Sequence, residues 1–184
     1  MRITRLDLEA RSASSVPVAP ELQARYLGGL GLSARLMADL DDPSLPPLHP
    51  DLPFLISVGS LTATGFPGAN RSCFFGVSPL TGLVAGSWMG GNFGTAFART
   101  GTMLLALEGR AAESSIVVMR DEGIEVVPRP DLWGLTISEA RARLAEDFPK
   151  ARFAMIGPAG ERQVAMACVR GDEGHAAGRC GLGA

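Results

Sequence analysis

A glycine-rich stretch from Gly65 to Gly94 holds the residues of this chain that are best suited to contact a ligand. Arg71 follows the first glycine turn, and five glycines fall among the last thirteen residues of the stretch. Glycine allows another group to approach the backbone closely, and a guanidinium offers five N–H donors with a permanent positive charge. The combination predicts contact with a large, flat or polyanionic ligand. The alternative is a scaffold in which the glycines only let strands cross closely.

Side chains that could perform catalysis without a cofactor are sparse. The cysteines Cys73, Cys168 and Cys180 are widely spaced, and the two histidines are His49 and His175. The sequence contains no CxxC pair, HExxH motif or Ser-His-Asp arrangement, so we expect neither zinc nor an iron–sulfur cluster to be held by this chain alone. We expect the cysteines to be small buried hydrophobes in a reducing cytosol, and the chain not to be catalytic by itself.

Composition and charge narrow the class of protein. The 184 residues, 46% of them hydrophobic, suffice for one domain with a sizeable core. No run approaches the roughly 20 apolar residues that a membrane helix needs, and the charges in the opening MRITRLDLEARS argue against a signal peptide. The net charge of −2 argues against general nucleic-acid binding. We therefore expect a cytoplasmic protein that contacts neither membrane nor nucleic acid.

Apolar periodicity predicts a chain of short strands with a few helices. A helical region begins at Pro20 and is interrupted at Gly28–Gly31, either as a phosphate-facing loop or as a bend between two helical pieces. Residues 41–53 predict a Pro-rich connector. The predicted strands are Ile3–Leu8, Val16–Val18, Phe54–Val58, Cys73–Val77, Met103–Leu107, Ser115–Met119, Ile124–Val127, Phe153–Ile156 and Val164–Val169, and the later helices are Gly91–Thr100 and Pro130–Asp147.

The two halves of the chain repeat the same order of features. A helix that begins at a proline, Pro20 or Pro130, is followed by an apolar strand, a glycine turn and an arginine, and each half closes on a glycine cluster. At an offset of 91 residues, Arg71 corresponds to Arg162 and Gly90 to Gly181. This order predicts an α+β fold, one pseudo-twofold domain over residues 1–184 built from two intertwined strands–helix–strands repeats, about 1–94 and 95–184.

Several motifs resemble one known family in their order along nearly the whole chain. They are YLGGLGLSARL, GANRSCFFGVSPLTG, SWMGGNFG followed by ARTG, DLWGLT, IGPAGE and AAGRCGLGA. The chain resembles the N-terminal domain of the aldehyde ferredoxin oxidoreductase family. The resemblance implies a β-rich base of two intertwined repeats that cradles tungstopterin, a tungsten or molybdenum ion held by two pterin dithiolenes.

The resemblance also assigns individual residues. Arg71 matches the arginine that reaches from the pterin toward a [4Fe-4S] cluster, which the family holds through domains outside this chain. One pterin-wrapping segment matches Trp88 and Gly90, and the other matches Ala177, Gly178, Arg179 and Gly181. The backbone carbonyls of Trp88 and Ala177 match the oxygen ligands of a magnesium ion that bridges the two pterin phosphates; hard cations prefer oxygen ligands of this kind. A carbonyl ligand tolerates Trp88 where the family often has Asn.

Three departures from the family pattern stand out. Leu30 and Ser33 occupy positions where the family often has Arg and Gly, which argues against a phosphate role for that loop, and Cys180 replaces a common Gly. The sequence stops at Ala184, inside the last motif, so we expect a fragment, a separate subunit or a stand-alone relative. The later domains, with their cluster cysteines, are not in these 184 residues.

The function implied by the resemblance is that of a cofactor-binding domain. The complete enzyme would oxidise aldehydes to carboxylates, a reaction of the EC 1.2.7 type, and pass electrons to ferredoxin; we expect it to be a homo-oligomer with partner domains or a partner subunit. The alternative is a non-catalytic relative that acts as a binding or assembly module, because faces that normally meet the other domains would seek a partner.

Overall fold

Two β-sheets and a hairpin carry most of the computed structural model, which describes residues 1–40, 42, 44–171 and 174–184. The six-stranded sheet has the order β2-β1-β6-β3-β4-β5; β1 and β6 run parallel, and the other neighbours are antiparallel. The short sheet has the order β11-β10-β9, and β7 pairs with β8. The strands are β1 (Arg2–Asp7), β2 (Ser12–Pro17), β3 (Phe54–Val58), β4 (Ser72–Val77), β5 (Val84–Met89), β6 (Thr102–Glu108), β7 (Ser115–Arg120), β8 (Gly123–Pro128), β9 (Ala154–Met155), β10 (Val169–Gly171) and β11 (Ala176–Ala177).

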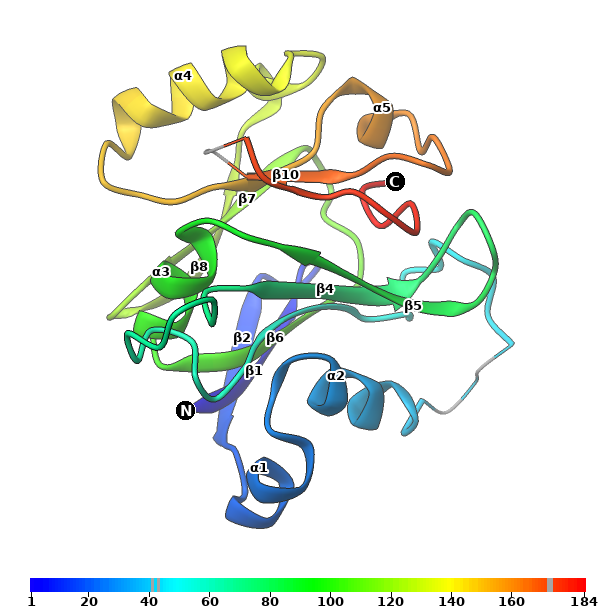
Figure 1. Ribbon diagram of the computed structural model, residues 1–184. Helices are drawn as coiled ribbons and strands as arrows, with labels where there is room; N and C mark the ends of the chain where they lie inside the picture. Colours follow the sequence, from blue (N-terminus) through cyan, green and yellow to red (C-terminus); the bar gives the residue numbers. More distant parts are fainter. Residues whose placement is uncertain (41, 43, 172–173) are drawn as a thin grey trace.

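The central strands are covered on both faces. Figure 1 shows α1 and α2 on one side of β4 and β5, and the short sheet with α4 and α5 on the other. Strands β4 and β6 are buried almost throughout, which explains why they read as continuous apolar runs instead of alternating ones. The helices are α1 (Pro20–Tyr26), α2 (Gly29–Met37), α3 (Phe93–Arg99), α4 (Ile137–Asp147) and α5 (Pro158–Glu161), with a 3₁₀ turn at Pro130–Leu132.

Most of the predicted elements are present, with two corrections and one alternative resolved. The helix predicted over Pro130–Asp147 is a 3₁₀ turn followed by α4, because Thr136 caps the helix: its hydroxyl accepts from the Glu139 N–H, and the Glu139 carboxylate accepts from the Thr136 N–H. The strand predicted over Val164–Val169 begins only at Val169. The interrupted helix after Pro20 is two helices, α1 and α2.

The Val164–Val169 prediction fails for a specific reason. The N–H of Ala167 donates to the Val164 carbonyl (2.8 Å) in a turn, and the Ala167 carbonyl accepts from Gly183 (3.0 Å). The backbone of this segment is therefore paired with the C-terminal residues and with itself. Of the predicted connector, residues 41 and 43 lie outside the described residues, and the described remainder has turns without helix or strand.

The mixed α+β class with a mostly sheet core is confirmed. Each half contains a hairpin, then helix, then three successive antiparallel strands: β1–β2, α1–α2 and β3–β4–β5, then β7–β8, α4 and β9–β10–β11. The two triplets differ in setting, because β3–β5 belong to the large sheet and β9–β11 form a short sheet of their own. The internal duplication therefore stays a prediction. Among the described residues, no helix is long and apolar enough to cross a membrane.

A buried hydroxyl pair fixes α2 on the large sheet. Ser33 of α2 and Ser57 of β3 are fully buried, and their hydroxyl oxygens lie 2.8 Å apart. The neighbouring Cys73 thiol of β4 is also buried, and this burial raises its pKa to about 11 although the Ser57 hydroxyl opposes the shift. Apolar side chains of α2 and the sheet, including Leu32 and Phe75, surround the pair.

We expect Ser33→Ala to destabilise the chain by about 1–2 kcal/mol, because it leaves the buried Ser57 hydroxyl without this partner. Urea unfolding checks the value. Ser12→Ala, on the exposed strand β2, is the control and should change the free energy of unfolding by less than about 0.5 kcal/mol. Equal effects of the two substitutions would contradict a role for the Ser33–Ser57 pair.

A second prediction concerns pH. Arg129 holds Asp131 with two hydrogen bonds (2.8 and 2.9 Å) and reaches Asp147 of α4 (2.7 Å). The guanidinium lowers the pKa of Asp131 from 3.8 to about 2. A lowered folded-state pKa stabilises the protein above the unfolded value, so this contribution is lost as pH falls from near 4 through 2. Asp131→Asn should flatten the acid limb of a stability–pH curve in that window, whereas Asp121→Asn, on the exposed β7–β8 turn, should leave the wild-type slope.

Candidate binding face at strands β5 and β11

Strand β5 is one edge of the large sheet, and its pairing with β4 determines where its backbone groups point. The Ser78 N–H donates to the Leu83 carbonyl (2.8 Å), and Ser72 stands opposite Met89 in the same register. Hydrogen-bonded pairs recur at every second residue of an antiparallel ladder, so Ser72 and Met89 are such a pair; the Ser72 hydroxyl also donates to the Met89 carbonyl (3.4 Å). The backbone N–H and carbonyl of Trp88 therefore point away from β4, toward the open edge.

Strand β11 is an edge of the short sheet, and the same reasoning applies to it. The Gly171 N–H donates to the His175 carbonyl (2.8 Å), and Val169 stands opposite Ala177. Val169 and Ala177 are thus the next hydrogen-bonded pair, and the Ala177 carbonyl turns toward β10. The carbonyl that was predicted to bind magnesium is part of the ladder. Its neighbour at Ala176 faces the open edge.

The two glycine clusters that the sequence singled out lie against each other. The Arg179 N–H donates to the Ser87 hydroxyl (3.3 Å), and the Cys180 sulfur lies 4.0 Å from the Gly86 carbonyl oxygen. Beneath this contact, buried side chains of both sheets form one cluster: Phe74, Met89, Val169, Ala177 and Leu182. The large sheet and the short sheet therefore meet at β5 and β11, and a shared apolar core holds these two edges together.

Residues at every second position of β5 present one face to solvent. A Cβ on Gly86 would stand 2.7 Å from Leu30, and a Cβ on Gly90 would stand 3.2 Å from the imidazole of His175. Between them, the indole of Trp88 is 45% exposed. A partly exposed leucine, a flat aromatic ring and an imidazole thus follow one another along the edge strand.

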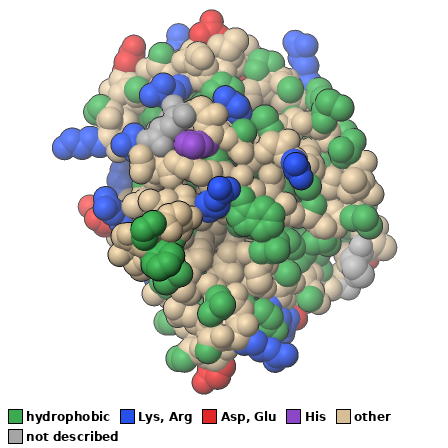
Figure 2. Space-filling model, in the orientation of Figure 1, with side chains coloured by type: hydrophobic (Ala, Val, Ile, Leu, Met, Phe, Trp, Pro, Cys, Tyr) green, Lys and Arg blue, Asp and Glu red, His purple; other side chains and the backbone are tan. Residues whose placement is uncertain are grey.

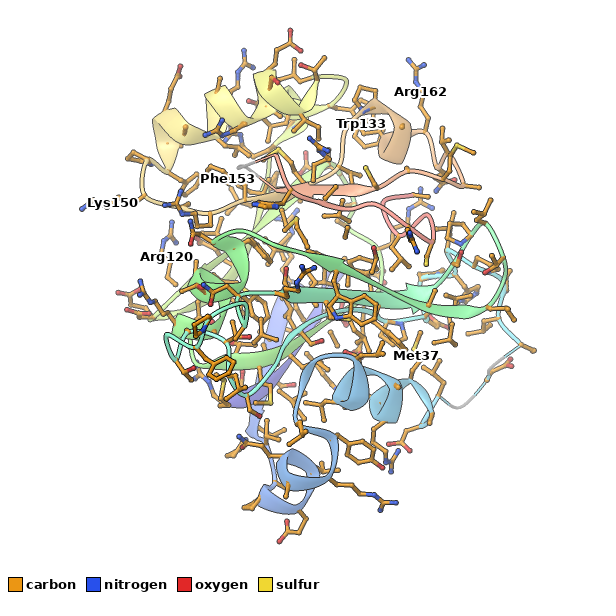
Figure 3. The ribbon with its side chains drawn as sticks, in the orientation of Figure 1. Met37, Arg120, Trp133, Lys150, Phe153 and Arg162 are labelled. Atoms are coloured by element: carbon orange, nitrogen blue, oxygen red, sulfur yellow. The ribbon has the colours of Figure 1, made fainter. Side chains whose placement is uncertain are left out.

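Arg71 lies at the same end of this face as Gly90. It precedes Ser72, whose partner is Met89, and Gly90 follows Met89, so Arg71 and Gly90 both lie one residue beyond the same end of the ladder. Arg71 is exposed, and no hydrogen bond or ion pair of its guanidinium to any described residue is found. The related Arg162 lies elsewhere: Figure 3 shows it beside α5, directed away from β4 and β5. The structure thus separates the two arginines that the sequence repeat aligned.

The glycines of the second cluster have a packing role. Gly181 is buried with φ +66°, and a Cβ there would stand 1.8 Å from the Ala165 carbonyl oxygen. A Cβ on Gly183 would stand 2.5 Å from Cys168 backbone atoms. At these positions glycine permits close backbone crossing. This is the scaffold role that the sequence offered as the alternative to ligand contact. The exposed residues of the cluster are Gly178 and Arg179.

Charge on this side of the molecule is unevenly distributed. Figure 2 shows basic side chains and a histidine around a central hydrophobic area, with acidic side chains toward the rim. Within the described residues, no group of three or more His, Cys, Asp or Glu side chains could hold a metal ion. Among the described residues, the outward backbone carbonyls and the arginine side chains are candidate ligand contacts at this face.

Two residues of this face were missed by the sequence-based assignment. His175 and Ala176 precede the predicted segment Ala177–Arg179. No signal in the sequence distinguishes Ala176 from Ala177, because the direction of a carbonyl depends on the ladder. The His175 contact was equally hidden, since it pairs residues that are 85 positions apart.

Comparison with known proteins agrees with the fold and the motif order. A family model described as aldehyde ferredoxin oxidoreductase, N-terminal domain, matches residues 3–184. Tungsten-containing aldehyde ferredoxin oxidoreductases of Pyrococcus furiosus and Thermococcus kodakarensis are 34% and 32% identical over 185 aligned positions, covering 100% of this chain. The chain spans only 31% of the length of each of these relatives.

A solved structure extends the comparison. The active site complex BamBC of benzoyl coenzyme A reductase, with bound 1,5-dienoyl-CoA, superposes with a TM-score of 0.94 at 29% identity. The match covers 99% of this chain and 28% of that one. Sequence and structure agree over the same segment, and the chain belongs to the family of the aldehyde ferredoxin oxidoreductase N-terminal domain.

Proposed function

We propose that this chain is the cofactor-binding base of a tungsten- or molybdenum-pterin oxidoreductase. The observation that carries the proposal is the meeting of two edge strands, β5 and β11, each with a backbone carbonyl directed to the open edge, beside an arginine without an ion pair to any described residue. Relatives over the whole chain are tungsten-containing enzymes, so a tungstopterin is the cofactor that we propose.

The residues at this face fit such a cofactor. Backbone carbonyl oxygens are suitable ligands for Mg²⁺, and we propose the carbonyls of Trp88 and Ala176 as the pair that would hold a magnesium ion between two pterin phosphates. Arg71 offers a fixed fork of donors for phosphate or pterin heteroatoms. The exposed Gly178 and Arg179 border the same edge. Ala177 and Gly181 support the face from below, since both are buried.

The division of labour follows from this arrangement. When bound, the metal with its pterins supplies two-electron redox chemistry, and the protein supplies binding, orientation and hydrogen bonds. Arg71 orients the bound group and brings a permanent positive charge to it. The carbonyls contribute oxygen donors that do not change protonation state. None of these residues needs to transfer a proton in this arrangement.

The activity of the complete protein is a wider proposal. Relatives that match the whole chain carry the name aldehyde ferredoxin oxidoreductase, so we propose aldehyde oxidation to a carboxylate with ferredoxin as acceptor. A [4Fe-4S] cluster would be held by the part of the relatives' length that lies outside this chain, either as further domains or as a partner subunit. Three free cysteines are consistent with a cytoplasmic location. Homo-oligomer formation stays a prediction.

The alternative function is that of a non-catalytic assembly module. Large apolar side chains are more than half exposed on both halves of the chain: Leu27, Leu61, Phe66, Trp133 and Met166. Surfaces of this kind favour a partner. This observation is compatible with both functions, because a cofactor base within a larger enzyme also has partner surfaces. Metal content distinguishes them.

We expect the chain, produced without oxygen in a host that makes pterin cofactors, to carry tungsten or molybdenum at close to one atom per chain or per pair of chains. Elemental analysis with pterin fluorescence after oxidation measures both components. Protein that is folded, forms a stable assembly and contains neither metal nor pterin would contradict the cofactor role and support the assembly module.

Arg71→Ala should lower the metal content at least several-fold while the melting temperature stays within about 2 °C of wild type, because an exposed arginine contributes little to stability. Arg162→Ala is the matched control: it removes the arginine at the aligned position, which lies beside α5, and should leave the metal content unchanged. Equal losses in both variants would contradict the specific role of Arg71.

A further inference from the structure

His175 has a defined orientation at the meeting of β5 and β11. Its Nδ1 lies 3.2 Å from the position that a Gly90 Cβ would occupy, followed by Cε1 at 3.5 Å and Cγ at 3.7 Å. The Nδ1 edge of the ring therefore packs on Gly90, and Nε2 lies on the far side. The residue is exposed, and within the described part of the chain its ring has no hydrogen bond or ion pair.

The contact with His175 favours a small residue at position 90. Gly90 does not have a positive φ angle, so conformational freedom does not require glycine there. A Cβ would instead stand close enough to the imidazole that the ring would have to shift by a few tenths of an ångström. Glycine at this position makes room for the ring.

The His175–Gly90 contact is close in sequence to both outward carbonyls. His175 directly precedes Ala176, and Gly90 follows Trp88 by two residues. Arg71 and Gly90 both lie one residue beyond the Ser72–Met89 end of the ladder. A ligand held at the two carbonyls therefore has an arginine and an imidazole at the same end.

We propose that His175 binds the anionic part of the cofactor, donating a hydrogen bond from Nε2–H to a phosphate oxygen. This inference rests on the proposed function and adds a second donor to Arg71. An N–H donor to a charged oxygen forms a short, charge-assisted bond, and a neutral imidazole with its proton on Nε2 is sufficient. The packing on Gly90 means that little freedom of the ring is lost when the ligand binds.

The test uses magnesium pyrophosphate, which has two phosphoryl groups bridged by the cation, and the purified chain. Calorimetry measures its dissociation constant, and ¹⁵N NMR locates the binding through the amides of Trp88, Gly90 and Ala176. His175→Phe keeps a ring to pack on Gly90 and removes the donor. We expect it to weaken binding about tenfold or more with an unchanged melting temperature. His175→Gln, which retains an N–H donor, should recover part of the affinity.

His49→Phe is the matched control, since His49 is the other histidine and lies before β3; it should bind like wild type. Wild-type affinity in His175→Phe would overturn the inference, and so would binding of the probe away from Trp88 and Ala176 or no binding at all. Metal and pterin content of the anaerobically produced wild-type chain judges the proposed function separately. If the wild-type chain carries metal and the probe binds His175→Phe with unchanged affinity, only the role of His175 is rejected and the proposed function stands.

Discussion

The packing of two sheet edges against each other is the constraint on which the candidate site depends. An edge strand presents a row of backbone groups without ladder partners, and here β5 and β11 are brought together by a common core of Phe74, Met89 and Val169. The same core that buries these side chains fixes the positions of the outward carbonyls. Fold stability and ligand geometry are thus coupled through one hydrophobic cluster, and the ladder alternation then decides which carbonyls are available.

Sequence patterns were sufficient for most elements, whereas the location of the candidate site stays a prediction. The glycine-rich segments around Gly90 and Gly178 occupy equivalent places in the two halves of the sequence, and the hydrogen bond between Arg179 and Ser87 joins them. Sequence patterns give no direction for the carbonyls of Ala176 and Ala177, because the alternation of hydrogen-bonded pairs depends on how two strands pair. Sequence patterns also predicted a strand over residues 164–168. An apolar run has the same pattern in a sheet strand and in a turn that is hydrogen-bonded to Gly183.

Glycine has two distinct physical roles at this face, although the sequence shows only a concentration of the residue. Gly181 and Gly183 are buried where one backbone crosses another, so their substitution would disturb the fold. Gly90 instead leaves space for an exposed ring. Among the described glycine-rich residues, Gly90 and the exposed residues 178 and 179 are therefore the better placed to contact a ligand.

A site built largely from backbone atoms tolerates sequence change, and this explains the departures from the family pattern. Trp88 occupies a position where the family often has Asn, yet the outward carbonyl depends on register and not on the side chain. Leu30 in place of Arg removes a charge and covers Gly86 with an apolar group. Positive charge at the face then comes from Arg71 near Gly90 and from the exposed Arg179. The exposed imidazole of His175, which packs on Gly90, is a polar group that could share the binding of an anion with these arginines.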